Sequence, residues 1–300
     1  MIHYDPHRWR DHFFDIHGTL VREIGGRVAV AVACAAVVTL LHEYKIAAVA
    51  IPSFLHTLVG SALGLLLVFR TNSSYDRFWE GRKLWGGIVN ETRNLVRASS
   101  VVLRDDRETV LRIARWTALF PWAATGVLRG TRGLGPHTSG LPEDEVAQAE
   151  NAQHQGLAVA ARITQCLDNA RRKGAISDIV FTSLDANVQQ LIDYLGGCER
   201  IRRTPLPFAY VVHLRRALVL FCGTLPFALV KDYGWGTILD VLVVSYIFFG
   251  IEEIGVEIEG PFGSDENDLP LEEISETIHR NLYALAAVDR QEREALEEGL

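Results

Sequence analysis

Several features that would indicate catalysis or nucleic-acid binding are missing from this sequence. Its formal net charge is -7 at neutral pH, with 30 basic and 37 acidic side chains. Because affinity for nucleic acid comes mainly from a basic surface, this balance argues against a nucleic-acid partner. The P-loop, the GxGxxG dinucleotide fingerprint and the GxSxG nucleophile motif do not occur. We therefore expect no enzymatic activity and no required cofactor.

Cysteine is also scarce, and so is the pattern of a β-strand. The four cysteines are widely scattered and none has CxxC spacing, which predicts small buried core residues in reducing surroundings. They are Cys34, Cys166, Cys198 and Cys222. Alternation of apolar and polar residues is not sustained anywhere, so we expect an all-α fold.

Long hydrophobic runs are what the sequence has in place of these features. Residues 46–69 carry no charged side chain, and residues 28–41 and 217–251 are nearly as apolar. A membrane-spanning helix needs about 20 apolar residues. With turns near Pro52 and at residues 231–234, the runs predict four transmembrane helices arranged as two hairpins, at about 27–69 and 205–258.

Basic residues flank these hairpins on one side only. The only basic residues counted at the hairpin tips are Lys45 and Lys231, whereas the open ends carry many arginines. Because basic residues favour the cytoplasmic side, we expect both termini and the middle of the chain in the cytoplasm, on the inner face of the plasma membrane. The basic residues of the open ends are Arg8, Arg10, Arg22, Arg27, Arg70, Arg77, Arg82, Lys83, Arg202, Arg203, Arg215 and Arg216.

The remaining chain is expected to be helical and cytoplasmic. We divide it into an N-terminal part with the first hairpin and its helical extension (1–125), a loop (126–142), cytoplasmic helices (143–204), the second hairpin (205–258) and a C-terminal tail (259–300). Helix-favouring composition is predicted to be continuous over 72–115, 143–172, 175–203 and 271–289. Neither half has a complete soluble core, so we expect one integrated domain.

A dense mixture of aromatic and charged residues follows the second hydrophobic run directly. Residues 70–87, here called the collar, read RTNSSYDRFWEGRKLWGG. On a helix, Tyr75, Trp79 and Arg82 share one face, so the collar should pack on several neighbours. The spacing predicts a cation–π contact of Arg82 with Trp79 or Trp85 and an ion pair between Glu80 and Lys83. An anchoring aromatic belt is the simpler alternative.

The collar resembles the signature of the bestrophin family. The matching positions are Phe69, Arg70, Asn72, Tyr75, Arg77, Trp79, Glu80, Arg82, Trp85 and Gly86. A second match lies after the last hydrophobic run, where residues 258–269 are similar to the family's Pro-Phe-Gly and acidic run. The two motifs occur in the right order, one after each hairpin.

The resemblance implies a homopentameric ion channel with an apolar neck and a cytoplasmic aperture. The family's neck positions fall on Phe54, Leu58 and Ala62, and its aperture falls near Ile179, with Ile176 as the competitor. Two other stripes are equally apolar. They are Leu55, Val59 and Leu63, and Leu58, Ala62 and Leu66. Apolar rings of this kind can gate by dewetting.

Two further expectations concern charge. In eukaryotic members the acidic run binds calcium, and Asp265 and Asp268 stand at matching positions, although a turn-capping role is the alternative. The family resemblance implies chloride or another small monovalent anion as the permeant ion. Glutamates at the end of the last hydrophobic run would instead attract cations if they face the pore. They are Glu252, Glu253, Glu257 and Glu259.

Two other functions stay open on the sequence alone. One is a membrane scaffold or regulatory protein with an occluded pore. The other is a four-helix secondary transporter, for which Asp240 is the only acid inside a hydrophobic run.

Overall fold

The protein is helical through the residues that its computed structural model describes, which are 20–46 and 50–287. No strand occurs in these ranges. The chain falls into two compact units. Of the described residues, the membrane unit comprises 20–46, 50–78, 205–261 and 265–268, and the polar unit comprises 79–204, 262–264 and 269–287.

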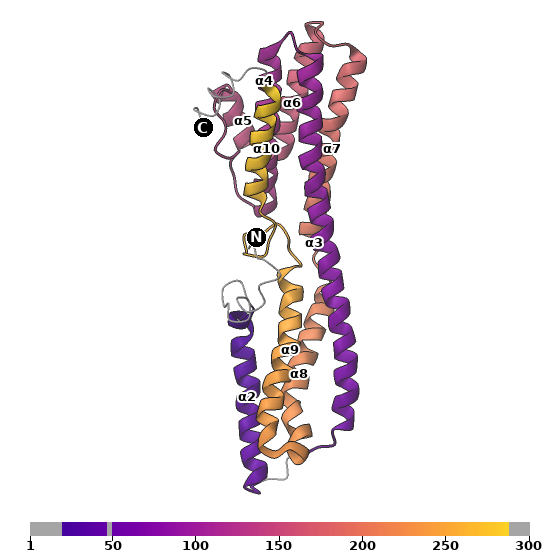
Figure 1. Ribbon diagram of the computed structural model, residues 1–300, viewed down its shortest axis with the longest axis vertical. Coiled ribbons are helices and arrows are strands. Elements are labelled where there is room, and N and C mark those ends of the chain that lie inside the picture. Colours follow the sequence, from indigo (N-terminus) through magenta and orange to yellow (C-terminus); the bar gives the residue numbers. More distant parts are fainter. Residues whose placement is uncertain (1–19, 47–49, 288–300) are drawn as a thin grey trace. The chain divides into compact units, whose positions relative to one another are not determined.

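The membrane unit is built on three helices that pack against one another (Figure 1). These are α2 (Val21–Glu43), α8 (Phe208–Tyr233) and α9 (Thr237–Glu257). A short 3-10 helix, η1 (Gly234–Gly236), reverses the chain between α8 and α9, and it begins at Gly234 with φ 51°. Small residues such as Ala35 and Cys222 are buried between the helices, which permits close packing in a membrane.

The helices of this unit are long and apolar enough to cross a bilayer. This holds for α2, for α3 (Phe54–Val102) and for the stretch Phe208–Glu257. Because η1 divides that last stretch into α8 and α9, the described residues provide four candidate crossings. The predicted all-α membrane fold is therefore confirmed.

Helix α3 serves both units and is continuous through the collar (Figure 1). Leu63 and Leu67 are buried in the membrane unit, and Trp85 and Ile88 are buried in the polar unit. The helix-favouring stretch 72–115 is divided between two helices, because α3 ends at Val102 and α4 (Arg107–Arg129) begins after a turn.

The start of α4 has a local cause. The side chain of Asp106 accepts hydrogen bonds from the backbone N–H and the hydroxyl of Thr109, at 3.2 and 2.8 Å. These bonds to the charged form lower the pKa of Asp106 below its ordinary value. They also satisfy a backbone donor that a helix N-terminus otherwise leaves unpaired, so a new helix starts here.

In the polar unit, α4 lies against α6 (Gln155–Arg172) and α10 (Leu271–Ala286), and α6 packs on α7 (Asp178–Arg203). The loop begins later than predicted, because α4 continues to Arg129 and ends on Gly130 with φ 73°. The predicted helix over 143–172 is two helices, α5 (Glu143–Asn151) and α6. His154 separates them, since its Nδ1 atom accepts the N–H of Leu157 at 3.2 Å.

Candidate pore and collar

The predicted neck residues lie on the first turns of α3 and point away from the core of the membrane unit. Phe54 is 79% exposed and Leu58 is 61% exposed, and Ala62 is exposed as well. In the alternative stripes, Leu63 is only 3% exposed and Leu66 packs against the core. Of the three stripes, only that of Phe54, Leu58 and Ala62 has every side chain exposed on the surface of the single chain.

The two aperture candidates differ in burial. Ile179 is the second residue of α7 and is 83% exposed. Ile176 lies before the helix and is buried in the polar unit, at 7% exposure. The side chain of Ser177 caps α7 by accepting the N–H of Val180 at 3.3 Å. The cap fixes the start of α7 at the end of the short connection from α6.

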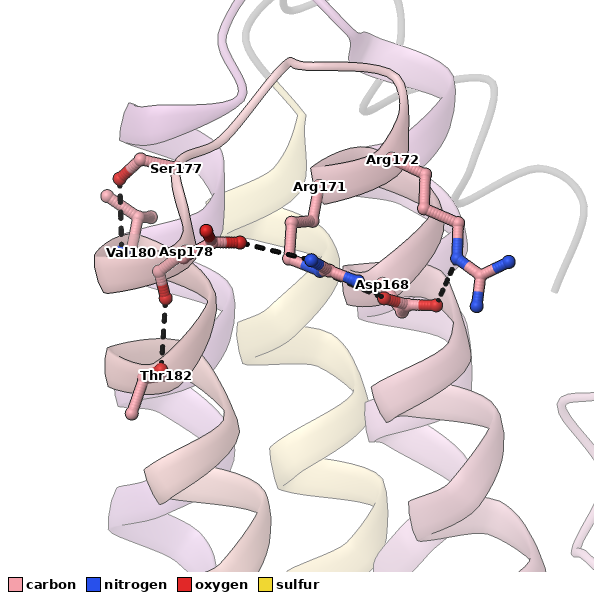
Figure 2. A network of polar contacts seen from close by, with 7 residues as sticks. All are labelled: Asp168, Arg171, Arg172, Ser177, Asp178, Val180 and Thr182. Carbon is pink, nitrogen blue, oxygen red and sulfur yellow. Dashed lines mark hydrogen bonds and ion pairs between the residues drawn. The ribbon is translucent and has the colours of Figure 1, made fainter.

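Charged residues near the end of α6 lie beside this first turn of α7 (Figure 2). Arg171 of α6 donates from Nη1 to Asp178, at 3.0 Å, and from Nε and Nη2 to Asp168, at 3.0 and 2.7 Å. The Arg171 guanidinium thereby holds the pKa of the Asp168 carboxyl below its ordinary value. Figure 2 shows Arg172 on the other side of Asp168, with its Nε atom 2.6 Å from that carboxylate.

The part of the collar in the membrane unit is organised around a buried arginine. Arg70 is 1% exposed, and its Nη2 atom lies 2.8 Å from a carboxylate oxygen of Glu259. The other carboxylate oxygen accepts the N–H of Leu206 at 2.8 Å. Arg77 donates from Nε to the backbone oxygen of Glu259 at 3.2 Å. Asn72 and Tyr75 are exposed on α3. Glu259 thus connects α3 to both ends of the second hairpin.

The part of the collar in the polar unit packs against α7. Trp85 is fully buried. Glu80 pairs with Arg200 of α7 at 3.2 Å, so the expected pairing with Lys83 is replaced by a contact between helices. Trp79 and Arg82 remain exposed, and the described residues contain no cation–π contact between Arg82 and either tryptophan. A Cβ atom added at Gly87 would lie 2.6 Å from the ring of Tyr194, which explains the glycine there.

The glutamates at the end of α9 have partners within the membrane unit. Glu252 is 2% exposed and contacts Arg215 at 2.8 Å and Arg27 at 3.5 Å. Glu253 lies 2.6 Å from Arg27. Glu257 accepts a hydrogen bond from Asn267 at 2.7 Å, while Glu259 binds Arg70. Carboxylates that are neutralised in this way attract permeant cations much less than free ones.

The acidic turn after α9 is closed by one of its own carboxylates. Asp268 is 4% exposed, and its Oδ2 atom accepts the N–H of Asp265 at 2.8 Å. Calcium takes about six to eight oxygen ligands. Within the described ranges there is no group of three or more His, Cys, Asp or Glu side chains arranged to hold a metal ion. The contact between Asp268 and Asp265 thus closes the turn.

Sequence reasoning missed two groups of polar residues. The link from Arg171 to Asp178 was missed, although Asp178 directly precedes the aperture candidate and the residues lie on either side of a short connection. The stack of His137 on His279, with ring centroids 3.8 Å apart, was also missed. No sequence spacing could have indicated that stack, because 141 intervening residues separate its members (279 − 137 − 1).

The chain matches proteins of known family over almost its whole length. Residues 1–284 match the model of the bacterial and fungal bestrophin proteins. A voltage-dependent anion channel-forming protein of Nostoc sp. is 40% identical, over 93% of this chain and 92% of that protein. A voltage-dependent anion channel-forming protein of Escherichia coli strain K12 is 31% identical, over 95% of this chain and 94% of that protein.

Solved structures agree with these relatives. The crystal structure of a bacterial bestrophin homologue from Klebsiella pneumoniae matches with a TM-score of 0.82 and 32% identity. The match covers 88% of this chain and 98% of that one. Together with the collar and the Pro-Phe-Gly turn, these similarities show that the chain is a membrane protein of the bestrophin family.

Proposed function

We propose that this chain assembles as a homopentamer in the plasma membrane and passively conducts small monovalent anions, chloride among them. Both termini face the cytoplasm in this proposal, as the distribution of basic residues predicts. The neck is formed by Phe54, Leu58 and Ala62, and the cytoplasmic aperture by Ile179. The relatives from Nostoc and Escherichia coli are named as anion channel-forming proteins, which supports this function.

The observation that carries the proposal is the apolar stripe at the start of α3. Large apolar side chains that a single chain leaves exposed must face lipid, another subunit or a pore. The stripe of Phe54, Leu58 and Ala62 continues along one face of a helix without a charged residue. Rings of such residues hold a passage narrow and can close it by dewetting.

Anions are favoured over cations because the acids at the end of α9 and directly after it are paired with arginines. Glu252 and Glu253 contact Arg27 and Arg215, and Glu259 contacts Arg70. The carboxylates at this end of the helix bundle are therefore paired with arginines rather than forming a ring of free acids. This supports the anion channel of the family against the cation preference that the glutamates alone suggest.

The transporter alternative finds little support in the position of Asp240. A carrier places a charged or broken-helix site near the middle of the membrane. Asp240 lies instead in the first turn of α9, next to the η1 turn of the hairpin. A scaffold with an occluded pore differs from a channel only in conduction, so a flux measurement separates them.

The experiment is chloride efflux from vesicles reconstituted with the purified protein. We expect efflux well above that of protein-free vesicles, together with a detergent-corrected mass of a pentamer. Efflux indistinguishable from that of protein-free vesicles would leave the scaffold as the better account. A monomer or dimer would contradict the pore formed by five α3 helices.

Calcium is proposed to be unnecessary for this activity, since Asp268 closes the turn that carries Asp265. Calorimetric titration with calcium tests this directly. We expect the wild type and the double variant Asp265→Asn/Asp268→Asn to give the same heat when calcium is added. Saturable heat that disappears in this variant would assign the acidic turn to calcium.

A further inference from the structure

A free carboxylate beside the aperture would oppose the proposed anion flux. Asp178 is the first residue of α7 and directly precedes Ile179. Its side chain is 86% exposed. In the proposed pentamer, each subunit therefore brings one carboxylate next to the narrow cytoplasmic passage. Rings of acidic side chains at such positions favour cations and repel anions.

Arg171 supplies a cation at this carboxylate. Its Nη1 atom lies 3.0 Å from Oδ1 of Asp178, and the same guanidinium is held by Asp168. The guanidinium carbon also lies 5.5 Å from the centre of the Phe181 ring. Contacts with a carboxylate on α6 and an aromatic ring on α7 keep the guanidinium at the junction of the two helices.

Arg172 has the same charge but a different position. It contacts Asp168 through Nε, and its side chain is 73% exposed. Figure 2 shows it directed away from the start of α7, so it does not reach Asp178. The chain thus offers two adjacent arginines that share one carboxylate partner, of which only Arg171 is bonded to the residue beside the aperture.

We propose that Arg171 is a specificity-determining residue of the channel, because its guanidinium compensates the Asp178 carboxylate beside Ile179 and so permits anions to pass. The inference rests on the proposed function, since it requires Ile179 to line the passage. It adds to that function a named pair of charges that sets the sign of the permeant ion.

The test is the ratio of chloride to sodium permeability, obtained from reversal potentials in planar bilayers under a sodium chloride gradient. Removing the compensating charge with Arg171→Gln should lower the ratio by roughly threefold or more at low salt, since unit charges within a Debye length interact appreciably. The effect should shrink in molar salt, where screening is strong. Arg172→Gln is the matched control and should leave the ratio close to that of the wild type.

Three further variants make the test specific. Arg171→Lys keeps the charge and should stay near the wild-type ratio. Asp178→Asn removes the carboxylate and should raise the ratio, and it should restore the ratio when combined with Arg171→Gln. If Arg171→Gln alone fails to assemble, the double variant still tests the Arg171 charge, because its ratio should lie below that of Asp178→Asn alone.

The outcomes separate the inference from the proposed function. Equal shifts in Arg171→Gln and Arg172→Gln would indicate a general surface charge and overturn the role of Arg171. Conduction with an unchanged ratio in Arg171→Gln and Asp178→Asn would overturn it as well, while the channel function stands. A wild-type protein that conducts no ion would refute the proposed function and this inference with it.

Discussion

At the scale of single residues, Arg70 places a strong constraint on the membrane unit. Its guanidinium is almost completely buried and is neutralised by Glu259, which also accepts the N–H of Leu206. A buried charge that loses its partner is costly, because neither water nor a counter-charge then stabilises it. The sequence indicates the arginine but not its partner, which lies 189 positions further along the chain (259 − 70).

We therefore predict that Glu259→Gln lowers stability by about 3 kcal/mol or more. The thermal unfolding midpoint of the detergent-solubilised protein measures this loss. Glu266→Gln, which removes an equal charge from an exposed position on the neighbouring turn, serves as the control and should change the midpoint little. Similar midpoints for both variants would mean that the ion pair with Arg70 contributes nothing to stability.

A second residue-level constraint lies at the contact of α3 with α7. The Cβ atom of Gly87→Ala would lie 2.6 Å from the Tyr194 ring, so either this ring or the two helices must shift. We expect a loss of about 1–3 kcal/mol. Gly196→Ala, whose Cβ atom meets nothing within 4 Å, should instead be neutral or stabilising, because alanine favours a helix interior. Chemical denaturation of both variants gives the comparison, and equal losses would contradict the close approach at Gly87.

At the scale of elements, the helices were predicted better than their ends. The long apolar runs made the membrane helices evident, because the bilayer requires about 20 apolar residues in one segment. The break between α3 and α4 was missed, since it depends on the single hydrogen-bonding side chain of Asp106. The neck stripe was predicted in three registers, and only the burial of Leu63 and the packing of Leu66 against the core distinguish them.

The neck hypothesis predicts the effect of trimming a side chain on α3. Leu58→Ala should raise single-channel conductance, because a smaller apolar ring widens the passage and is easier to wet. Leu220→Ala on α8 is the matched control, since Leu220 is similarly exposed, at 66%, but lies outside the proposed neck. Recordings in planar bilayers that show no increase for Leu58→Ala, or an equal increase for both variants, would remove Leu58 from the neck.

The packing of α10 depends on a buried histidine stack. His279 is 1% exposed, and its ring lies on those of His137 and Tyr283, at 3.8 and 4.2 Å between centroids. Burial, together with His137, lowers the pKa of His279 to about 4. The titratable and charged groups that face the stack are His137, Glu276, Tyr283 and Arg115.

This pKa predicts how stability depends on pH. In the unfolded chain His279 takes up a proton near its ordinary pKa of about 6.5. The folded state resists this proton, so stability is lost as pH falls from about 6.5 towards 4, with roughly 2 kcal/mol lost at pH 5. His279→Phe keeps an aromatic ring without the titration. Denaturant unfolding at pH 7 and pH 5 should show a smaller acid loss for this variant, and an identical loss would exclude His279 as the cause.

At the scale of the whole molecule, the account depends on several copies of the chain. One subunit leaves Phe54, Leu58 and Ile179 exposed, and it pairs its buried acids with arginines inside the membrane unit. The collar motif indicated the family from the sequence alone. The choice between Ile179 and Ile176 needed the structure, because only the packing of the polar unit shows that Ile176 is buried and Ile179 is exposed. The sign of the permeant ion depends on which charges are paired, and pairing between distant residues cannot be deduced from sequence.

The central claim is that the wild-type protein is an anion-conducting pore, and the reversal potential in a planar bilayer under a sodium chloride gradient tests it most directly. The account predicts a current whose reversal potential lies close to the equilibrium potential of chloride. A reversal potential near that of sodium, or no current above that of the protein-free bilayer, would contradict it.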